Sequence, residues 1–153
     1  MSTVELCLVH RSATLGLLVL LGWQVAYAQS LGATFGEVIR LSGTPSDIVL
    51  DESRSRLYLV NTNANRVNIY DYKAKALVGS ISVGDTPLAA AMSMDNAWLY
   101  VTNNGSATLS VIDLGSNSVV QTVTLAARPE GVAVGNDGRV LITTQGTGSG
   151  NQF

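Results

Sequence analysis

Apolar and polar residues alternate in short segments over most of the chain. The apolar segments are rich in β-branched and aromatic residues, and Gly, Asn, Asp, Ser and Pro separate them. Segments of this kind predict β-strands bounded by turns, and none after residue 28 has helical periodicity. The expected strands cover residues 47–50, 57–60, 67–70 and 77–83, followed by 88–92, 99–102, 109–112 and 119–125.

The strand pattern repeats at a constant interval of 42 residues. Two sets of three residues keep this interval without an insertion: Pro45, Pro87 and Pro129, and Leu57, Leu99 and Leu141. A period of about 40–45 residues built from four short strands is typical of one blade of a β-propeller. The sequence therefore predicts an all-β fold, a β-propeller of four-stranded antiparallel blades. The blades span residues 45–83, 87–125 and, incompletely, 129–144.

These repeats do not complete a ring. They supply about two and a half blades, and residues 35–41 add one predicted outermost strand that lacks a blade of its own. A propeller ring needs at least about four blades. We therefore expect this sequence to be a fragment, with the remaining blades supplied by a longer chain. The alternative is a ring assembled from several copies of this chain.

The first 28 residues predict a secretory signal peptide. Residues 15–21 form an apolar run, and Ala26-Tyr27-Ala28 matches the small-x-small pattern before a cleavage site at Gln29. The apolar run is shorter than the roughly 20 residues of a transmembrane helix, although an uncleaved anchor is the alternative. Residues 29–153 are thus expected outside the cytoplasm, as a secreted, periplasmic or cell-surface protein without membrane attachment.

The composition of the mature chain excludes several kinds of catalytic and metal-binding site. The only cysteine, Cys7, and the only histidine, His10, both lie in the predicted signal peptide. Without them there is no disulfide, no thiolate nucleophile, no Ser-His-Asp triad and no His or Cys metal ligand. No catalytic residue, cofactor or metal is therefore predicted. The net charge is −2 and the basic residues are scattered, so no nucleic-acid partner is expected.

Loops at one end of the blades gather amides and charged side chains. On blade geometry, the loop between the second and third strands shares a rim with the loop that leads into the next blade. The predicted binding residues on this rim are Asn61, Asn103, Asp85, Arg128 and Glu130. Such groups can hold a sugar, a peptide or a calcium ion. The competing interpretation is structural, because Asn tolerates left-handed backbone in turns and Asp bonds nearby N–H groups.

Two further residues stand at positions where the other repeats carry different side chains. Asp47 begins an innermost strand where Ala89 and Gly131 stand in the other units, so its carboxylate could point into the central channel. Solvation at the strand start is the alternative. Trp98 could be a stacking platform for a sugar, or it could pack against the next blade.

Segments of the second and third repeats resemble a known family. Leu99-Tyr100-Val101-Thr102-Asn103, Leu109-Ser110-Val111-Ile112-Asp113 and Pro129-Glu130-Gly131-Val132-Ala133-Val134 are similar to the YVTN-type β-propeller repeat. The resemblance covers residues 35 to about 144. Members of this family include surface-layer and periplasmic propellers, so the resemblance implies a propeller fold and a place outside the cytoplasm.

Two functions follow from these observations. The first is a non-catalytic scaffold that binds a protein or a glycan through its rim. The alternative is a fragment of a propeller enzyme, lactonase-like or of a cofactor-dependent dehydrogenase type, whose catalytic residues lie in the missing blades. Channel-facing His, Asp or Glu in those blades would favour the enzyme.

Overall fold

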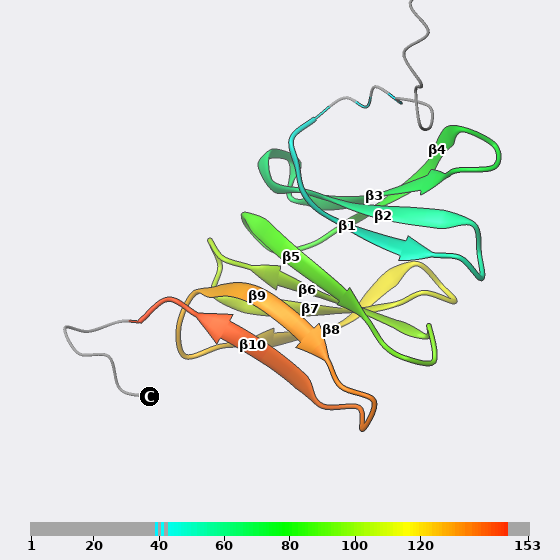
Figure 1. Ribbon diagram of the computed structural model, residues 1–153. Coiled ribbons are helices and arrows are strands. Elements are labelled where there is room, and N and C mark those ends of the chain that lie inside the picture. The colour runs from blue at the N-terminus through cyan, green and yellow to red at the C-terminus, as the bar shows by residue number, and fades with distance from the viewer. Residues whose placement is uncertain (1–38, 40, 42, 147–153) are drawn as a thin grey trace, which may run out of the picture. The chain divides into compact units, whose positions relative to one another are not determined.

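The computed structural model describes residues 39, 41 and 43–146, shown in colour in Figure 1. The predicted signal peptide and the cleavage site at Gln29 lie outside these residues. Of the predicted outermost strand, residues 35–41, only Ile39 and Leu41 are described, and neither belongs to a strand. No helix among the described residues is long and apolar enough to cross a membrane.

The described residues form three antiparallel sheets that follow one another along the chain (Figure 1). The first contains β1 (Pro45–Asp51), β2 (Arg56–Asn61), β3 (Arg66–Asp71) and β4 (Ala76–Ser82), with one 3₁₀ turn, Thr62–Ala64, between β2 and β3. The second contains β5 (Pro87–Met92), β6 (Trp98–Asn103), β7 (Thr108–Asp113) and β8 (Ser118–Thr124). The third is the pair β9 (Pro129–Val134) and β10 (Val140–Thr144). We call these sheets blades 1, 2 and 3.

The blades repeat in register as well as in length. Pro45 opposes Asn61 and Pro87 opposes Asn103, and in both blades the pairing shifts immediately after the proline. Proline cannot donate a hydrogen bond to a neighbouring strand, so it is tolerated at the first residue of a strand and at bulges. The pairing of the third and fourth strands also shifts at matching points, after Ile69 in blade 1 and after Val111 in blade 2.

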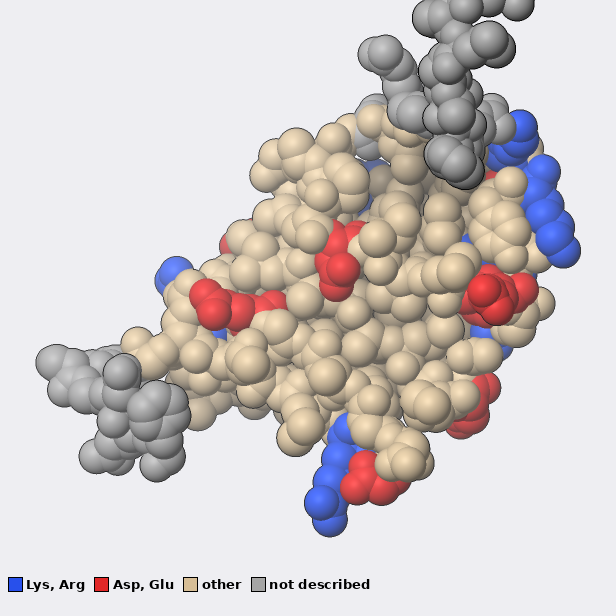
Figure 2. Space-filling model, in the orientation of Figure 1, with Lys and Arg blue, Asp and Glu red and all other residues tan. Residues whose placement is uncertain are grey.

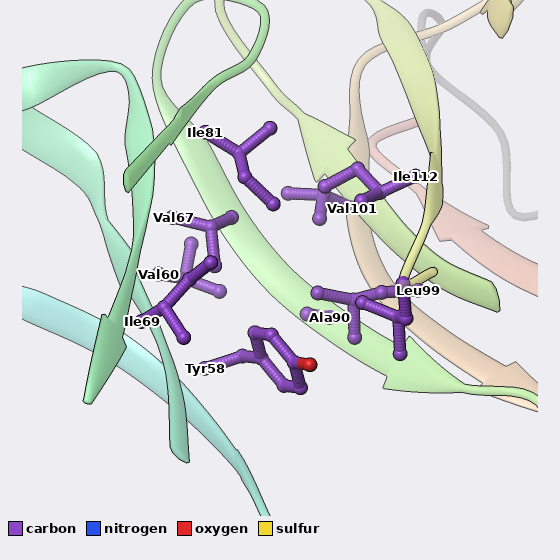
Figure 3. Close-up of a cluster of buried hydrophobic side chains, with 10 residues drawn as sticks. Tyr58, Val60, Val67, Ile69, Ile81, Ala90, Leu99, Val101 and Ile112 are labelled. Atoms are coloured by element: carbon purple, nitrogen blue, oxygen red, sulfur yellow. The ribbon is translucent and has the colours of Figure 1, made fainter. Parts of the chain in front are cut away.

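The hydrophobic core lies between blades 1 and 2, whose faces pack against each other (Figure 3). From blade 1 it contains Tyr58, Val60, Val67, Ile69 and Ile81, and from blade 2 Ala90, Leu99, Val101, Ile112 and Leu114. Alternate residues of each strand point to opposite faces, so a blade inside a ring buries apolar side chains on both. The predicted all-β fold with four-stranded antiparallel blades is thus confirmed.

Candidate functional site

The predicted rim is held together by hydrogen bonds that recur from blade to blade. The Thr62 hydroxyl in blade 1 donates to the carbonyl oxygen of Pro87 at 2.8 Å. Asn104, 42 residues later in blade 2, donates its side-chain amide to the carbonyl oxygen of Pro129 at 2.9 Å. Each loop between second and third strands therefore anchors the start of the next blade, which fixes the rim as one ordered surface.

Asp85 is an exposed residue at the junction of three of these loops. Its Oδ1 accepts a hydrogen bond from the Asn65 side-chain amide at 3.0 Å, while Asn65 Oδ1 accepts from the Thr86 N–H at 3.0 Å. The Asp85 N–H donates to the Ser106 hydroxyl at 3.2 Å, and its carbonyl accepts from Gly105 N–H at 3.0 Å. Asp85 is thus positioned by both flanking blades and still presents its carboxylate at the surface.

Asn61 and Asn103, also predicted as binding residues, have their side chains in the interior. Asn103 is fully buried, and its amide nitrogen donates to the hydroxyls of Thr108 at 3.0 Å and Ser110 at 2.9 Å. Asn61 is buried and has extended backbone, with φ −105°, so it does not fill a left-handed turn. Neither side chain is available to a ligand at the rim surface, because both are buried.

Arg128 and Glu130 flank Pro129 at the start of β9, and both are exposed. Glu130 Oε1 accepts a hydrogen bond from the Gln145 side chain at 3.0 Å, and the Arg128 carbonyl accepts from the Gln145 N–H at 2.8 Å. The structure thus places three of the five predicted residues, Asp85, Arg128 and Glu130, at the surface of blade entrances.

The Asp47 carboxylate accepts hydrogen bonds between the innermost strands of blades 1 and 2. Its Oδ2 accepts a hydrogen bond from the Ala90 N–H of blade 2 at 2.8 Å, and its Oδ1 accepts from the following Ile48 N–H at 2.8 Å. The carboxylate therefore joins β1 to β5. In the described part of the chain, the role of Asp47 is therefore to connect two blades.

The rim opposite these loops carries a buried carboxylate. Asp51 at the end of β1 is fully buried and accepts hydrogen bonds from the Ser53 hydroxyl at 2.5 Å and the Arg54 guanidinium at 2.8 Å. Burial alone would raise the pKa of Asp51, but the hydrogen bonds from Ser53 and Arg54 outweigh it and hold this pKa below its ordinary value. Arg54 also donates to the Asn96 carbonyl at 2.8 Å, which bridges blades 1 and 2.

Two properties of the described residues bear on chemistry. Among them, no group of three or more His, Cys, Asp or Glu is placed to hold a metal ion. The charged side chains visible in Figure 2 stand in small separate groups among uncharged residues.

The second rim also carries a cleft that the sequence alone did not predict. The cleft has a volume of about 360 Å³ and lies between the β5–β6 turn and the β9–β10 turn. Trp98 and Tyr100 line it, together with Asp95 and Asn136. The sequence does mark one residue of the cleft, since Trp98 stands where the other repeats carry Arg56 and Val140. The residues from the neighbouring blade could not be assigned to the cleft without the packing.

No protein-family model matches the chain, and no curated protein matches it either. Several solved structures do match the chain. Kuenenia stuttgartiensis hydrazine synthase is 25% identical, with a TM-score of 0.64 over 75% of this chain and 33% of that one. Virginiamycin B lyase from Staphylococcus aureus is 15% identical, with a TM-score of 0.57 over 65% of this chain and 34% of that one.

A further similar structure is the β-propeller domain of Cps50 (Swd1) from Myceliophteria thermophila. It is 15% identical, with a TM-score of 0.55 over 63% of this chain and 30% of that one. This chain thus spans about a third of the length of these structures. The repeat, the blades and these similarities together define the chain as a β-propeller protein.

Proposed function

We propose that this chain belongs to a non-catalytic β-propeller scaffold that binds a protein or a glycan through Asp85, Arg128 and Glu130. The observation that carries the proposal is that strand side chains are buried between blades, whereas charged side chains on the rim loops are exposed. Strand side chains such as Tyr58 and Leu99 are fully buried between blades, and the Asp47 carboxylate joins two innermost strands. Exposed charged side chains on an ordered rim remain for recognition, as is common for loops on a rigid scaffold.

The proposal includes location and family. The apolar run followed by Ala26-Tyr27-Ala28 supports export, with the mature protein secreted, periplasmic or at the cell surface. The segment Leu99–Asn103 supports membership of the YVTN-type repeat family. Intact-mass analysis of the exported product should give a chain that begins at Gln29. A product that retains Met1 would contradict the export part of the proposal.

A binding screen with matched arginine variants tests the rim. The full chain is screened against glycans and peptides, and the ligand found is then titrated into Arg128→Ala and Arg139→Ala. Both arginines are exposed, but Arg139 lies on the opposite rim, where it pairs with Asp137 at 3.2 Å. We expect Arg128→Ala to weaken binding several-fold while the melting temperature stays unchanged, and Arg139→Ala to bind as the unmodified chain does.

Asp85→Asn is the second rim variant, because it keeps the side-chain shape and removes the charge. Equal binding by Asp85→Asn, Arg128→Ala and the unmodified chain would contradict a rim site. Catalytic activity that appears only when further blades are present would instead support the enzyme alternative, with its active site in those blades.

A further inference from the structure

The cleft on the opposite rim lies between blade 2 and the two described strands of blade 3, and its lining residues differ from their equivalents between blades 1 and 2. At the boundary between blades 1 and 2, Arg54 reaches across to donate a hydrogen bond to the Asn96 carbonyl at 2.8 Å. The residue 42 positions later, at the boundary between blades 2 and 3, is Asn96 itself, whose side chain is shorter. The arginine that bridges blades 1 and 2 thus has no equivalent arginine at the boundary that holds the cleft.

The residues that face each boundary from the next blade along the chain also differ. Met92 faces the boundary between blades 1 and 2, packed against the core, and its equivalent 42 residues later is the smaller Val134, followed by Gly135. Tyr58 is fully buried at the first boundary, whereas its equivalent Tyr100 is only half-buried. The core around Tyr58 includes Ile112 and Leu114 from the second half of blade 2, whereas blade 3 contributes only β9 and β10 among the described residues, so Tyr100 keeps one face open to the cleft.

The cleft combines aromatic rings with hydrogen-bonding groups at its edge. Trp98 is 36% exposed and lines the cleft together with Tyr100. The Asp95 carboxylate accepts hydrogen bonds from the Ser93 hydroxyl at 2.5 Å and the Ala97 N–H at 3.1 Å, which hold its position. Those bonds lower the pKa of Asp95, so it is an ionised acceptor at neutral pH. Asn136, from the β9–β10 turn, adds a side-chain amide to the lining.

The lining also excludes some ligand classes. It contains no Lys or Arg, and its single charged group is the Asp95 carboxylate, so phosphates and other anions are disfavoured. A volume of about 360 Å³ lies within the range of about 300–1,000 Å³ that is common for small-molecule pockets. A pyranose ring fits this chemistry, because its C–H face can lie on an indole ring while its hydroxyls donate to a carboxylate.

We propose that the cleft between Trp98, Asp95 and Asn136 binds a neutral carbohydrate, with a pyranose ring stacked on Trp98 and a hydroxyl donated to Asp95. This site lies on the rim opposite Asp85, Arg128 and Glu130. It is therefore independent of the function proposed above, and either can fail without the other.

Tryptophan fluorescence reports on this site directly. The chain has two tryptophans, Trp23 and Trp98, so Trp23→Phe in the full chain leaves Trp98 as the only source of indole emission. Chitohexaose, cellohexaose and maltohexaose are titrated separately. We expect one of them to change the Trp98 emission in a saturable way and to protect it from quenching by acrylamide.

Calorimetric titration of that oligosaccharide then separates the roles of the lining residues. Trp98→Ala is expected to weaken binding about tenfold, in line with the energy of a lost aromatic contact, and Trp98→Phe to restore part of it. Asp95→Asn should weaken binding several-fold. Gln121→Ala, at an exposed residue of β8 that belongs to neither proposed site, is the control and should bind normally, and melting curves establish that each variant is folded.

Three outcomes would overturn the proposal. The first is an unchanged Trp98 emission with all three oligosaccharides. The second is equal affinity of Trp98→Ala and the unmodified chain. The third is a response to choline but not to the sugars, which would assign the rings and Asp95 to a cationic ligand instead.

Discussion

At the scale of single residues, polar side chains in this protein are mostly committed to holding the blades together. The carboxylates of Asp47 and Asp51 both lie on β1, and each serves a contact that reaches blade 2, directly from Asp47 and through Arg54 from Asp51. Asp51 is fully buried while Arg54 is partly exposed, so the pair is sheltered on one side only. Removing a partner from a buried hydrogen-bonded charge leaves an unsatisfied group, which is costly.

Asp51→Asn tests this contact through pH. Because the pKa of Asp51 is lower in the folded chain than in the unfolded chain, its stabilisation is complete above the unfolded value of about 3.9 and is lost as pH falls through the folded value. We expect the variant to lose about 1–3 kcal/mol of stability at pH 7 and to show a smaller decline in melting temperature between pH 5 and pH 3. Thermal unfolding followed by circular dichroism measures both.

Asp137→Asn is the control for that experiment, since Asp137 is exposed and pairs with the exposed Arg139. A surface pair of this kind contributes about 0–1 kcal/mol. A difference between Asp51→Asn and the unmodified chain that stays constant at every pH would contradict the assigned role of the ionised carboxylate.

At the scale of elements, the connection between blades 1 and 2 depends on close approach of the backbone. A Cβ at Gly84 would lie 2.6 Å from Asn103 Cγ and 2.7 Å from Ser106 Oγ. Asn103 cannot move easily, because its amide is held by Thr108 and Ser110 inside blade 2. Gly84 is therefore needed to let the connection pass over the end of β6.

Gly84→Ala should destabilise the protein by about 1–3 kcal/mol, the usual cost of forcing extra volume into a packed site. The measurement is chemical denaturation of the full chain. Gly79→Ala, within β4, is the matched control, because its added Cβ would meet only Ile69 Cδ1 at 3.6 Å, an ordinary contact. Equal stability of the two variants would show that the connection yields without cost.

At the scale of the whole molecule, blade 1 presents an apolar face that blade 2 does not cover. Ile48 and Leu50 on β1 are 57% and 49% exposed. Their equivalents 42 residues later are Ala90, a buried core residue, and Met92, which packs against the core. In blade 2 this face packs against blade 1. In blade 1 the equivalent face is uncovered among the described residues. Exposed apolar patches larger than a few hundred Å² mark association surfaces.

The full chain, studied alone, is therefore expected to oligomerise or aggregate rather than remain a monomer. Size-exclusion chromatography with light scattering measures the state. The double variant Ile48→Thr/Leu50→Thr keeps strand-forming residues and should shift the population toward monomer. Met94→Thr, a change at a 70% exposed residue in a turn, is the control and should leave association unchanged. A monodisperse monomer of the unmodified chain with a cooperative melt would contradict this expectation.

The sequence by itself determined the strands, the 42-residue period and the class of fold. These are local or repeated properties, since alternation and turn residues act within a few positions, and the prolines mark each new blade. The tertiary structure decided which side chains remain for function. Asn103 and Asp85 both looked like rim residues, yet packing buried the first and left the second exposed. Trp98 lines a cleft together with Asn136, which comes from another blade. Such pairings depend on how neighbouring blades meet, which no single segment of the chain encodes.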